Sequence, residues 1–181
     1  MSLYGASVEY GLHCLLYLVD PPEGVRPSSR DLAEFQGVSP AYIAKLFTEL
    51  QKAGLVSASE GVNGGFSLAR PASTITVLDV ADALEGGKPL FSCREVRDRC
   101  VLVDPNKAKP SQRGVCAIHA VMLEGERRMR ETLAETSLAD IAETVAGKQS
   151  QRAVTARRHW FENRAQSRRA TTTRPGSDKG D

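Results

Sequence analysis

Residues 28–71 read SSRDLAEFQGVSPAYIAKLFTELQKAGLVSASEGVNGGFSLARP, and this stretch decides the fold. Ser28 followed three residues later by Asp31 is a capping-box arrangement, in which the two side chains satisfy exposed amides of a helix's first turn. We therefore predict a short helix that runs to about Phe35. Gly37 then breaks this helix, because glycine readily adopts the backbone angles that follow a helix C-terminus.

A second helix is expected to begin directly after this break. Ser39 suits the N-cap position, and Pro40 suits the first helical position, where a missing amide proton costs nothing. Gly54 ends the helix. Its apolar residues recur at spacings of three and four and should face inward: Ile43, Leu46, Phe47 and Leu50. Two short helices joined by a three- or four-residue turn are typical of a helix-turn-helix, whose second helix enters the major groove of DNA.

Two short apolar segments follow the second helix. Leu55 and Val56 precede a glycine turn at 61–65, and residues 66–68 come after it, which predicts a β-hairpin. A hairpin directly after a recognition helix is a wing, and its glycine tip lets the backbone approach DNA. The predicted DNA-contacting residues belong to the helix starts, the polar side of the second helix and the wing: Ser28, Ser39, Pro40, Tyr42, Lys45, Gly64 and Arg70.

The main alternative for this segment is a helical hairpin that makes protein contacts. Residues 1–71 carry 5 Lys or Arg against 7 Asp or Glu, a net charge of −2, whereas a basic face is usual for a DNA-binding domain. Helix N-terminal amides can nevertheless hold phosphates without side-chain charge. The order of capped helix, glycine turn, Ser-Pro start and glycine hairpin favours DNA binding.

Residues 72–146 contain a cysteine-rich loop and further helical segments, and we predict that they form a second unit. Residues 93–119, CREVRDRCVLVDPNKAKPSQRGVCAIH, hold three of the four cysteines and one of the three histidines. Clustered cysteines in a reducing compartment more often bind metal or sense redox state than form disulfides. Zinc is the inorganic alternative to a redox or iron site, but structural zinc sites usually show a tight C-x2-4-C pair, which this loop lacks.

The fourth cysteine, Cys14, lies in the apolar run LHCLLYLV of a helix expected over 4–19. It is interpreted as a buried hydrophobe.

A long amphipathic helix is expected after Cys116. Its apolar side chains should face a second copy of the chain: Ile118, Val121, Met122, Met129 and Leu133. Ser137 followed by Asp140 then caps a short final helix, SLADIAETVA. A twofold dimer along the long helix predicts a palindromic DNA site.

The last residues differ in composition from the rest. Residues 151–181 carry 8 Lys or Arg against 3 Asp or Glu, net +5, while residues 1–150 carry 16 against 19, net −3. Few core-forming residues occur here, so we expect a mostly disordered tail with a helical turn or two around Trp160. It either solvates the protein or adds attraction to nucleic acid. The predicted units are 1–71, 72–146 and the tail 147–181.

Several function classes are disfavoured. No apolar run approaches the length of a membrane span, and the N-terminus lacks the pattern of a secretion signal, so we expect a cytoplasmic protein. No glycine-rich phosphate loop, HExxH or nucleophile elbow indicates an enzyme. A pure electron carrier has no use for a winged helix. The predicted fold is mainly α with a small β-hairpin wing, as a winged helix-turn-helix domain plus a long dimerisation helix.

The segments VEYGLHCLLYL, SRDLAEFQGVSPAYIAKLFTELQKAGLVSASEGVNGGFSLARP and ITVLDVADALEG, followed by the cysteine loop, resemble the IscR, NsrR and RirA regulators of the Rrf2 family. The resemblance covers about residues 1–146. It implies a homodimeric winged-helix transcription factor, of which many members bind a 2Fe-2S cluster through three cysteines of the loop. The motif VEYGLH most resembles the redox-sensitive regulator RsrR.

The resemblance leaves two ligand sets open. Fifteen residues separate Cys100 from Cys116, more than the commonest spacing in the family, which puts the role of Cys100 in doubt. Glu9 and His13 share one face of the first helix, which in this family lies near the partner's loop. In the favoured set Cys93 and Cys116 join the second subunit's Glu9 and His13. In the other, all three loop cysteines join one residue of that helix; His119 ranks behind His13.

The implied function is a homodimeric repressor that senses redox or a related signal through a 2Fe-2S cluster. The alternative is a cluster-free regulator of the same fold that responds through thiol oxidation, zinc or a partner protein.

Overall fold

The computed structural model describes residues 4–61, 64–104, 106, 107, 109, 111 and 114–172, and the predicted helix-turn-helix is present. Helix α2 spans Ser29–Gln36, and α3 spans Pro40–Lys52. The backbone amide of Ser28 donates to the Asp31 carboxylate at 2.8 Å, and the Asp31 amide donates to the Ser28 hydroxyl at 3.2 Å, so the capping box is complete. Gly37 ends α2 in the left-handed region at φ 68°.

The wing consists of strands β1, Val56–Ser59, and β2, Gly65–Leu68. The strands are antiparallel, with Val56 opposite Leu68 and Ser59 opposite Gly65. Gly65 lies against the chain before α2, where an added Cβ would stand 2.2 Å from the carbonyl oxygen of Arg26. Only glycine allows this approach, which joins the wing to the helix-turn-helix. Residues 62 and 63 of the predicted tip lie outside the described residues.

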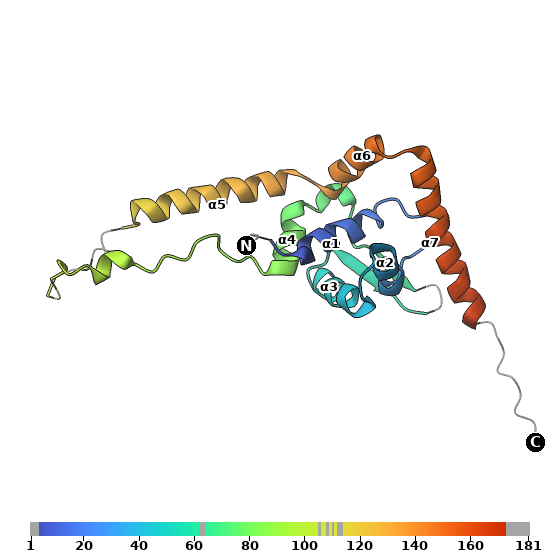
Figure 1. Ribbon diagram of the computed structural model, residues 1–181, viewed down its shortest axis with the longest axis horizontal. Coiled ribbons are helices and arrows are strands. Elements are labelled where there is room, and N and C mark those ends of the chain that lie inside the picture. The colour runs from blue at the N-terminus through green and yellow to red at the C-terminus, as the bar shows by residue number, and fades with distance from the viewer. Residues whose placement is uncertain are drawn as a thin grey trace, which may run out of the picture.

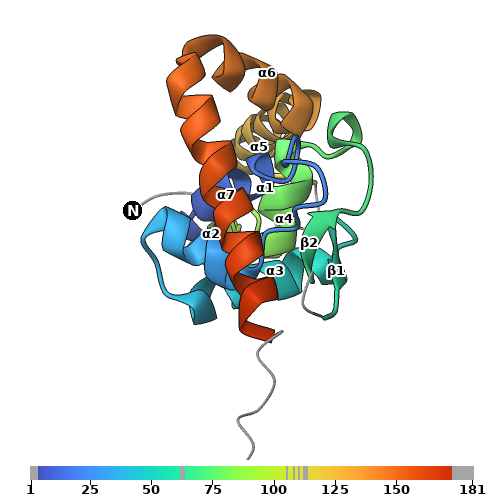
Figure 2. The same cartoon turned by 90° about the vertical axis from the view of Figure 1, so that its right-hand side faces the viewer.

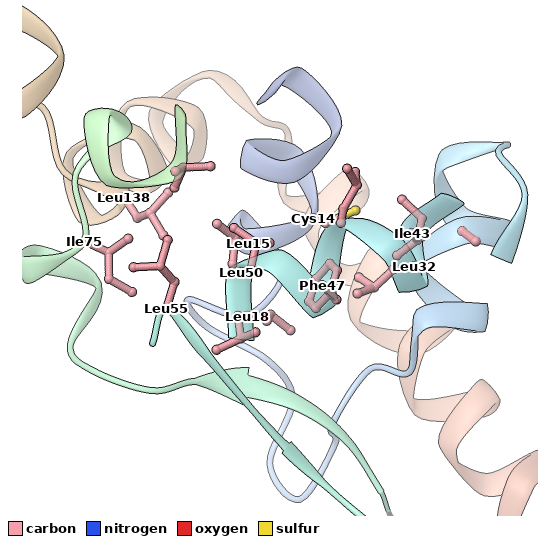
Figure 3. Packing of buried hydrophobic residues seen from close by; sticks show 14 of the residues in the cluster. Cys14, Leu15, Leu18, Leu32, Ile43, Phe47, Leu50, Leu55, Ile75 and Leu138 are labelled. Carbon is pink, nitrogen blue, oxygen red and sulfur yellow. The ribbon is translucent and has the colours of Figure 1, made fainter. Parts of the chain in front are cut away.

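Helix α1, Ala6–Leu16, and helix α4, Val77–Glu85, pack against the helix-turn-helix and complete its core. A second capping box, between Thr76 and Asp79, begins α4. The predicted inward face of α3 is confirmed, because Ile43, Phe47 and Leu50 are fully buried beside Cys14 of α1 (Figure 3). A short 3-10 helix, η1, at Ala72–Thr74 connects the wing to α4.

Helix α5, Ala117–Glu135, extends away from this body beside the segment that follows α4 (Figure 1). In the described structure no residue of α5 is buried, and Ile118 and Val121 are each 70% exposed. Helix α6, Leu138–Lys148, returns to the body and begins with the predicted Ser137–Asp140 capping box. An antiparallel bridge between Thr76 and Ser137 joins the starts of α4 and α6.

The expectation of a disordered tail is wrong for residues 151–172, which form helix α7, Gln151–Thr172. Phe161 and Ala165 lie one turn apart and are 3% and 6% exposed. They pack against the core, where the ring of Phe161 stacks on Phe35 at 5.1 Å and contacts Tyr17. Tertiary burial therefore orders a segment whose polar composition predicts disorder. Residues 173–181 of the predicted tail lie outside the described residues.

The predicted fold class is confirmed: the described structure is mainly helical with one antiparallel hairpin. Among the described residues, no helix combines the length and the apolar character that crossing a bilayer requires.

Candidate metal centre and nucleic-acid interface

The cysteine loop and the start of α5 line one open cavity of about 390 Å³. Cys93, Cys100 and Cys116 all line it, although 23 positions separate the first from the last in sequence. Its other lining residues include Phe91, Arg97, Ile118 and His119. A cavity of this size leaves room for a group larger than one ion. The structure thus brings the three predicted thiols to one place within a single chain.

The tightest set of potential ligands in the described structure is Cys93, Glu95 and His119, whose donor atoms all lie within 4.8 Å of one another. The Cys93 thiol donates to the Glu95 carboxylate at 3.6 Å. Glu95 has positive backbone angles, φ 46° and ψ 47°, which are costly for a residue with a side chain and are often retained at functional sites. Sequence reasoning missed Glu95, because one acidic residue in a charged loop carries no pattern.

Cys116 occupies the N-cap position of α5. Hydrogen bonds from the backbone amides of His119 and Ile118 lower the pKa of its thiol, and the nearby Arg97 guanidinium lowers it further. Arg97 itself donates to Glu95 at 3.0 Å and to the carbonyl of Gly114 at 3.0 Å, in the loop that follows the short 3-10 helix η2, Val96–Arg99. This cysteine is therefore placed to act as a thiolate ligand.

Cys14 behaves in the opposite way. It is fully buried in α1, and burial raises the pKa of its thiol to about 12. The interpretation of Cys14 as a core hydrophobe is confirmed.

Glu9 and His13 lie one turn apart on α1, and both side chains are exposed. The same helix directs Val8, Gly11, Cys14 and Leu15 into the core. The cavity around Cys93 is not lined by Glu9 or His13 of the same chain. Both side chains are therefore open to a second subunit, as the favoured ligand set requires.

The start of α3 is the exposed part of the helix-turn-helix. Ser39, Pro40 and Lys45 are exposed, and the Tyr42 amide donates to the Ser39 hydroxyl at 3.3 Å. Tyr42 is half-buried, because its ring packs edge-on against Tyr10 of α1 with 5.7 Å between centroids. The recognition helix therefore contacts α1 through Tyr42 while presenting its N-terminal turn to solvent.

The wing residues have structural partners that the sequence does not reveal. Arg70 donates to the carbonyl of Thr74 at 2.6 Å and to the Asp79 carboxylate at 2.8 Å, so it ties the wing to the start of α4. Gly64 closes the hairpin, since an added Cβ would lie 2.4 Å from the carbonyl oxygen of Ser59. Ser28, similarly, uses its hydroxyl within the capping box.

This combination of winged helix-turn-helix and cysteine loop matches a known group of regulators. Residues 4–144 match the Rrf2 family, described as an iron-dependent transcriptional regulator. The chain belongs to the Rrf2 family. The HTH-type transcriptional regulator YffB of Lactococcus lactis is 34% identical over 135 residues, which cover 75% of this chain and 83% of YffB.

Two solved structures share the fold of this Rrf2 protein. IscR of T. potens superposes with a TM-score of 0.60 at 22% identity and covers 83% of this chain and 93% of its own. CymR, the global cysteine regulator of B. subtilis, gives a TM-score of 0.58 at 24% identity, covering 80% of this chain and 98% of CymR. The protein is accordingly a DNA-binding transcriptional regulator and not an enzyme. Helix α7 lies beyond the family match.

Proposed function

We propose that this Rrf2 regulator is a cytoplasmic homodimeric repressor that senses redox state through a 2Fe-2S cluster. The observation that carries the proposal is the convergence of three loop thiols on one cavity at the N-terminus of α5. Iron–sulfur clusters are held mainly by thiolates, and histidine replaces cysteine at some sites. The donor set of the cavity therefore fits such a cluster, which when bound supplies reversible one-electron chemistry.

Two residues of the loop, Cys93 and Cys116, are the proposed thiolate ligands. Glu9 and His13 of the second subunit are the proposed remaining ligands, which is the ligand set suggested by the resemblance to RsrR. Their exposure on α1 supports this assignment. In the competing set, Cys100 replaces Glu9 or His13. Cys100 is exposed, whereas Cys93 and Cys116 are half-buried, which disfavours Cys100 as a ligand.

The second subunit is proposed to pack along α5. The exposed Ile118 and Val121 support this surface, because they lie three residues apart on one face of α5 and contiguous exposed apolar patches mark interaction sites. A twofold dimer would present two copies of α3 to a palindromic operator.

A second candidate function is a cluster-free regulator that binds a single metal ion. The close spacing of Cys93, Glu95 and His119 within one chain favours it, since a thiolate, a carboxylate and an imidazole suit zinc. The structural neighbour CymR is named for cysteine regulation.

The visible spectrum of anaerobically purified protein separates the two functions. A cluster gives absorption bands between about 300 and 600 nm that bleach with dithionite. A colourless protein that contains one zinc per chain would establish the second candidate and exclude the first.

Substitutions at the start of α3 test the proposed DNA interface. We expect Lys45→Ala to weaken operator binding and to reduce the salt slope by about one unit, since one phosphate contact is lost. Tyr42→Ala should also weaken binding. Tyr42→Phe keeps the ring contact with Tyr10, so any change in its operator affinity is due to the hydroxyl group alone. The control is Lys52→Ala at the far end of α3, where Lys52 pairs with Glu49. Unchanged footprints for both Tyr42→Ala and Lys45→Ala would remove α3 from the interface.

A further inference from the structure

Helix α7 is built into the DNA-binding unit although it lies outside the region that the family shares. Figure 2 shows it lying across α2. Its aromatic rings extend the aromatic cluster of the core. Trp160 contacts Phe35 at 5.0 Å between centroids, and Phe161 stacks on the same ring. Phe35 belongs to α2, the first helix of the helix-turn-helix. The apolar contact therefore joins α7 directly to the element that supports the recognition helix.

Charged contacts join the same two helices. Arg164 pairs with the Glu34 carboxylate at 2.5 Å, and its Nε lies 3.5 Å from Asp31. Arg168 also forms an ion pair with Asp31, and it donates to the carbonyl of Arg26 at 3.0 Å. Two arginines of α7 thus converge on the first turn of α2 and on the chain that precedes it.

The burial of the Asp31 carboxylate makes the loss of these contacts costly. Asp31 supplies the capping-box carboxylate of α2, and it is only 2% exposed. A buried carboxylate is costly unless cations and hydrogen bonds compensate its charge. Removing an arginine therefore leaves that charge under-compensated at the N-terminus of α2, a few residues from the turn that sets the direction of α3.

The charge of α7 also complements that of the domain beneath it. Residues 1–71 carry a net charge of −2, while α7 has six arginines and one glutamate, net +5. Three carboxylates of the domain, those of Asp20, Asp31 and Glu34, pair with arginines of α7. The acidic surface that argues against DNA binding in the sequence is thus partly neutralised by a helix of the same chain.

We propose that α7 is a positioning helix of the DNA-binding unit, in which Arg164 and Arg168 hold α2 in the orientation that operator recognition requires. The inference rests on operator contact by α3 and is independent of the cluster. Arg164 and Arg168 are positioning residues that act through Asp31 and Glu34. Their loss should therefore lower affinity for the operator more than affinity for a random duplex.

The test compares Arg168→Met with Arg152→Met in the full-length protein. Both substitutions remove one positive charge from α7, but Arg152 is exposed at the start of the helix. Operator and random-duplex affinities are measured by fluorescence anisotropy at fixed salt, and amide hydrogen exchange reports α2. We expect operator affinity to fall about fivefold further in Arg168→Met than in Arg152→Met, with equal random-duplex affinities. Faster exchange in α2 should accompany this loss.

Arg168→Lys should recover part of the operator affinity, because the ammonium keeps the pairing with Asp31 but cannot also reach the Arg26 carbonyl. Equal operator affinities for Arg168→Met and Arg152→Met would overturn the proposal and leave α7 as a source of charge alone.

A second variant keeps the test decisive if Arg168→Met fails to fold. Glu34→Gln removes the partner of Arg164 on the exposed side of α2, and Glu143→Gln on α6 is its charge-matched control. The ratio of operator to random-duplex affinity should fall in Glu34→Gln only; an equal ratio in both variants contradicts the proposal. Lys45→Ala and Tyr42→Ala distinguish failure of the α3 assignment from failure of this proposal. If both variants bind the operator normally, the α3 assignment fails; if both bind weakly while Arg168→Met matches Arg152→Met, only the positioning role of α7 is contradicted.

Discussion

Cys93→Ala and Cys116→Ala are each expected to yield colourless protein after anaerobic purification, whereas Cys100→Ala stays coloured. Thiolates form the strong bonds to iron, and a carboxylate oxygen cannot hold the cluster in their place. Cys93 and Cys116 lie half-buried in the loop cavity, whereas Cys100 is exposed. Visible absorbance and iron content per chain are the measurements.

Variants of α1 complete this prediction. Glu9→Ala and His13→Ala should retain colour but shift the visible spectrum and the reduction potential, because a ligand has changed. They should also weaken the dependence of DNA affinity on redox state, since coupling requires that the two redox states favour different arrangements of the dimer. Colourless Cys100→Ala protein together with an unperturbed Glu9→Ala, His13→Ala double variant would replace the mixed-ligand set with the three-cysteine set.

His119→Ala and Glu95→Ala distinguish two ligand sets. One is the group of Cys93, Glu95 and His119 within a single chain; the other includes Glu9 and His13 of the second subunit, as the resemblance suggests. If the second subunit supplies Glu9 and His13, both variants should remain coloured. Loss of colour in either one would show that the ligand atoms brought within 4.8 Å in a single chain are the ones used.

Deletion of residues 150–181 is expected to destabilise the DNA-binding domain as well as to weaken its binding to DNA. The deletion exposes the surface that buries Phe161 and Ala165, and losing a buried aromatic side chain costs about 3 kcal/mol. For a domain of this size that corresponds to a fall of roughly 10 °C in the melting temperature. Circular dichroism melts and nonspecific DNA affinity are the readouts.

Deletion of residues 173–181 is the matched control for this truncation. That segment carries two basic and two acidic residues, so its removal leaves the net charge unchanged. It should melt like the full-length protein. A truncation at residue 149 with an unaltered melting temperature would show that α7 adds nothing to the stability of the domain.

The parts of the fold that the sequence predicts depend on contacts between residues no more than four positions apart. The cap of α2 at Ser28, the cap of α3 at Ser39 and the capping box at Ser137 were all predictable, because each is a hydrogen bond between near neighbours in the chain. The same holds for the buried face of α3, whose spacing follows the period of the helix.

The candidate site was predictable only in part. The thiols are recognisable by residue type, and their clustering in sequence indicated a common role. Spacing does not single out Glu95 and places His119 behind His13, because neither spacing nor composition shows that a loop folds back onto the start of α5. Arg70 was predicted to approach DNA, whereas its described partners are Thr74 and Asp79.

The sequence by itself determined the winged helix-turn-helix, its capped helices and which thiols are candidate ligands, since short-range hydrogen bonds, helical periodicity and residue type depend only on near neighbours in the chain. Only the tertiary structure decided that the three loop thiols line one cavity, that α7 is a helix and that its Arg168 compensates a buried carboxylate 137 positions away at Asp31. A segment this polar becomes ordered because distant side chains bury Phe161 and Ala165, and that burial depends on the path of the whole chain.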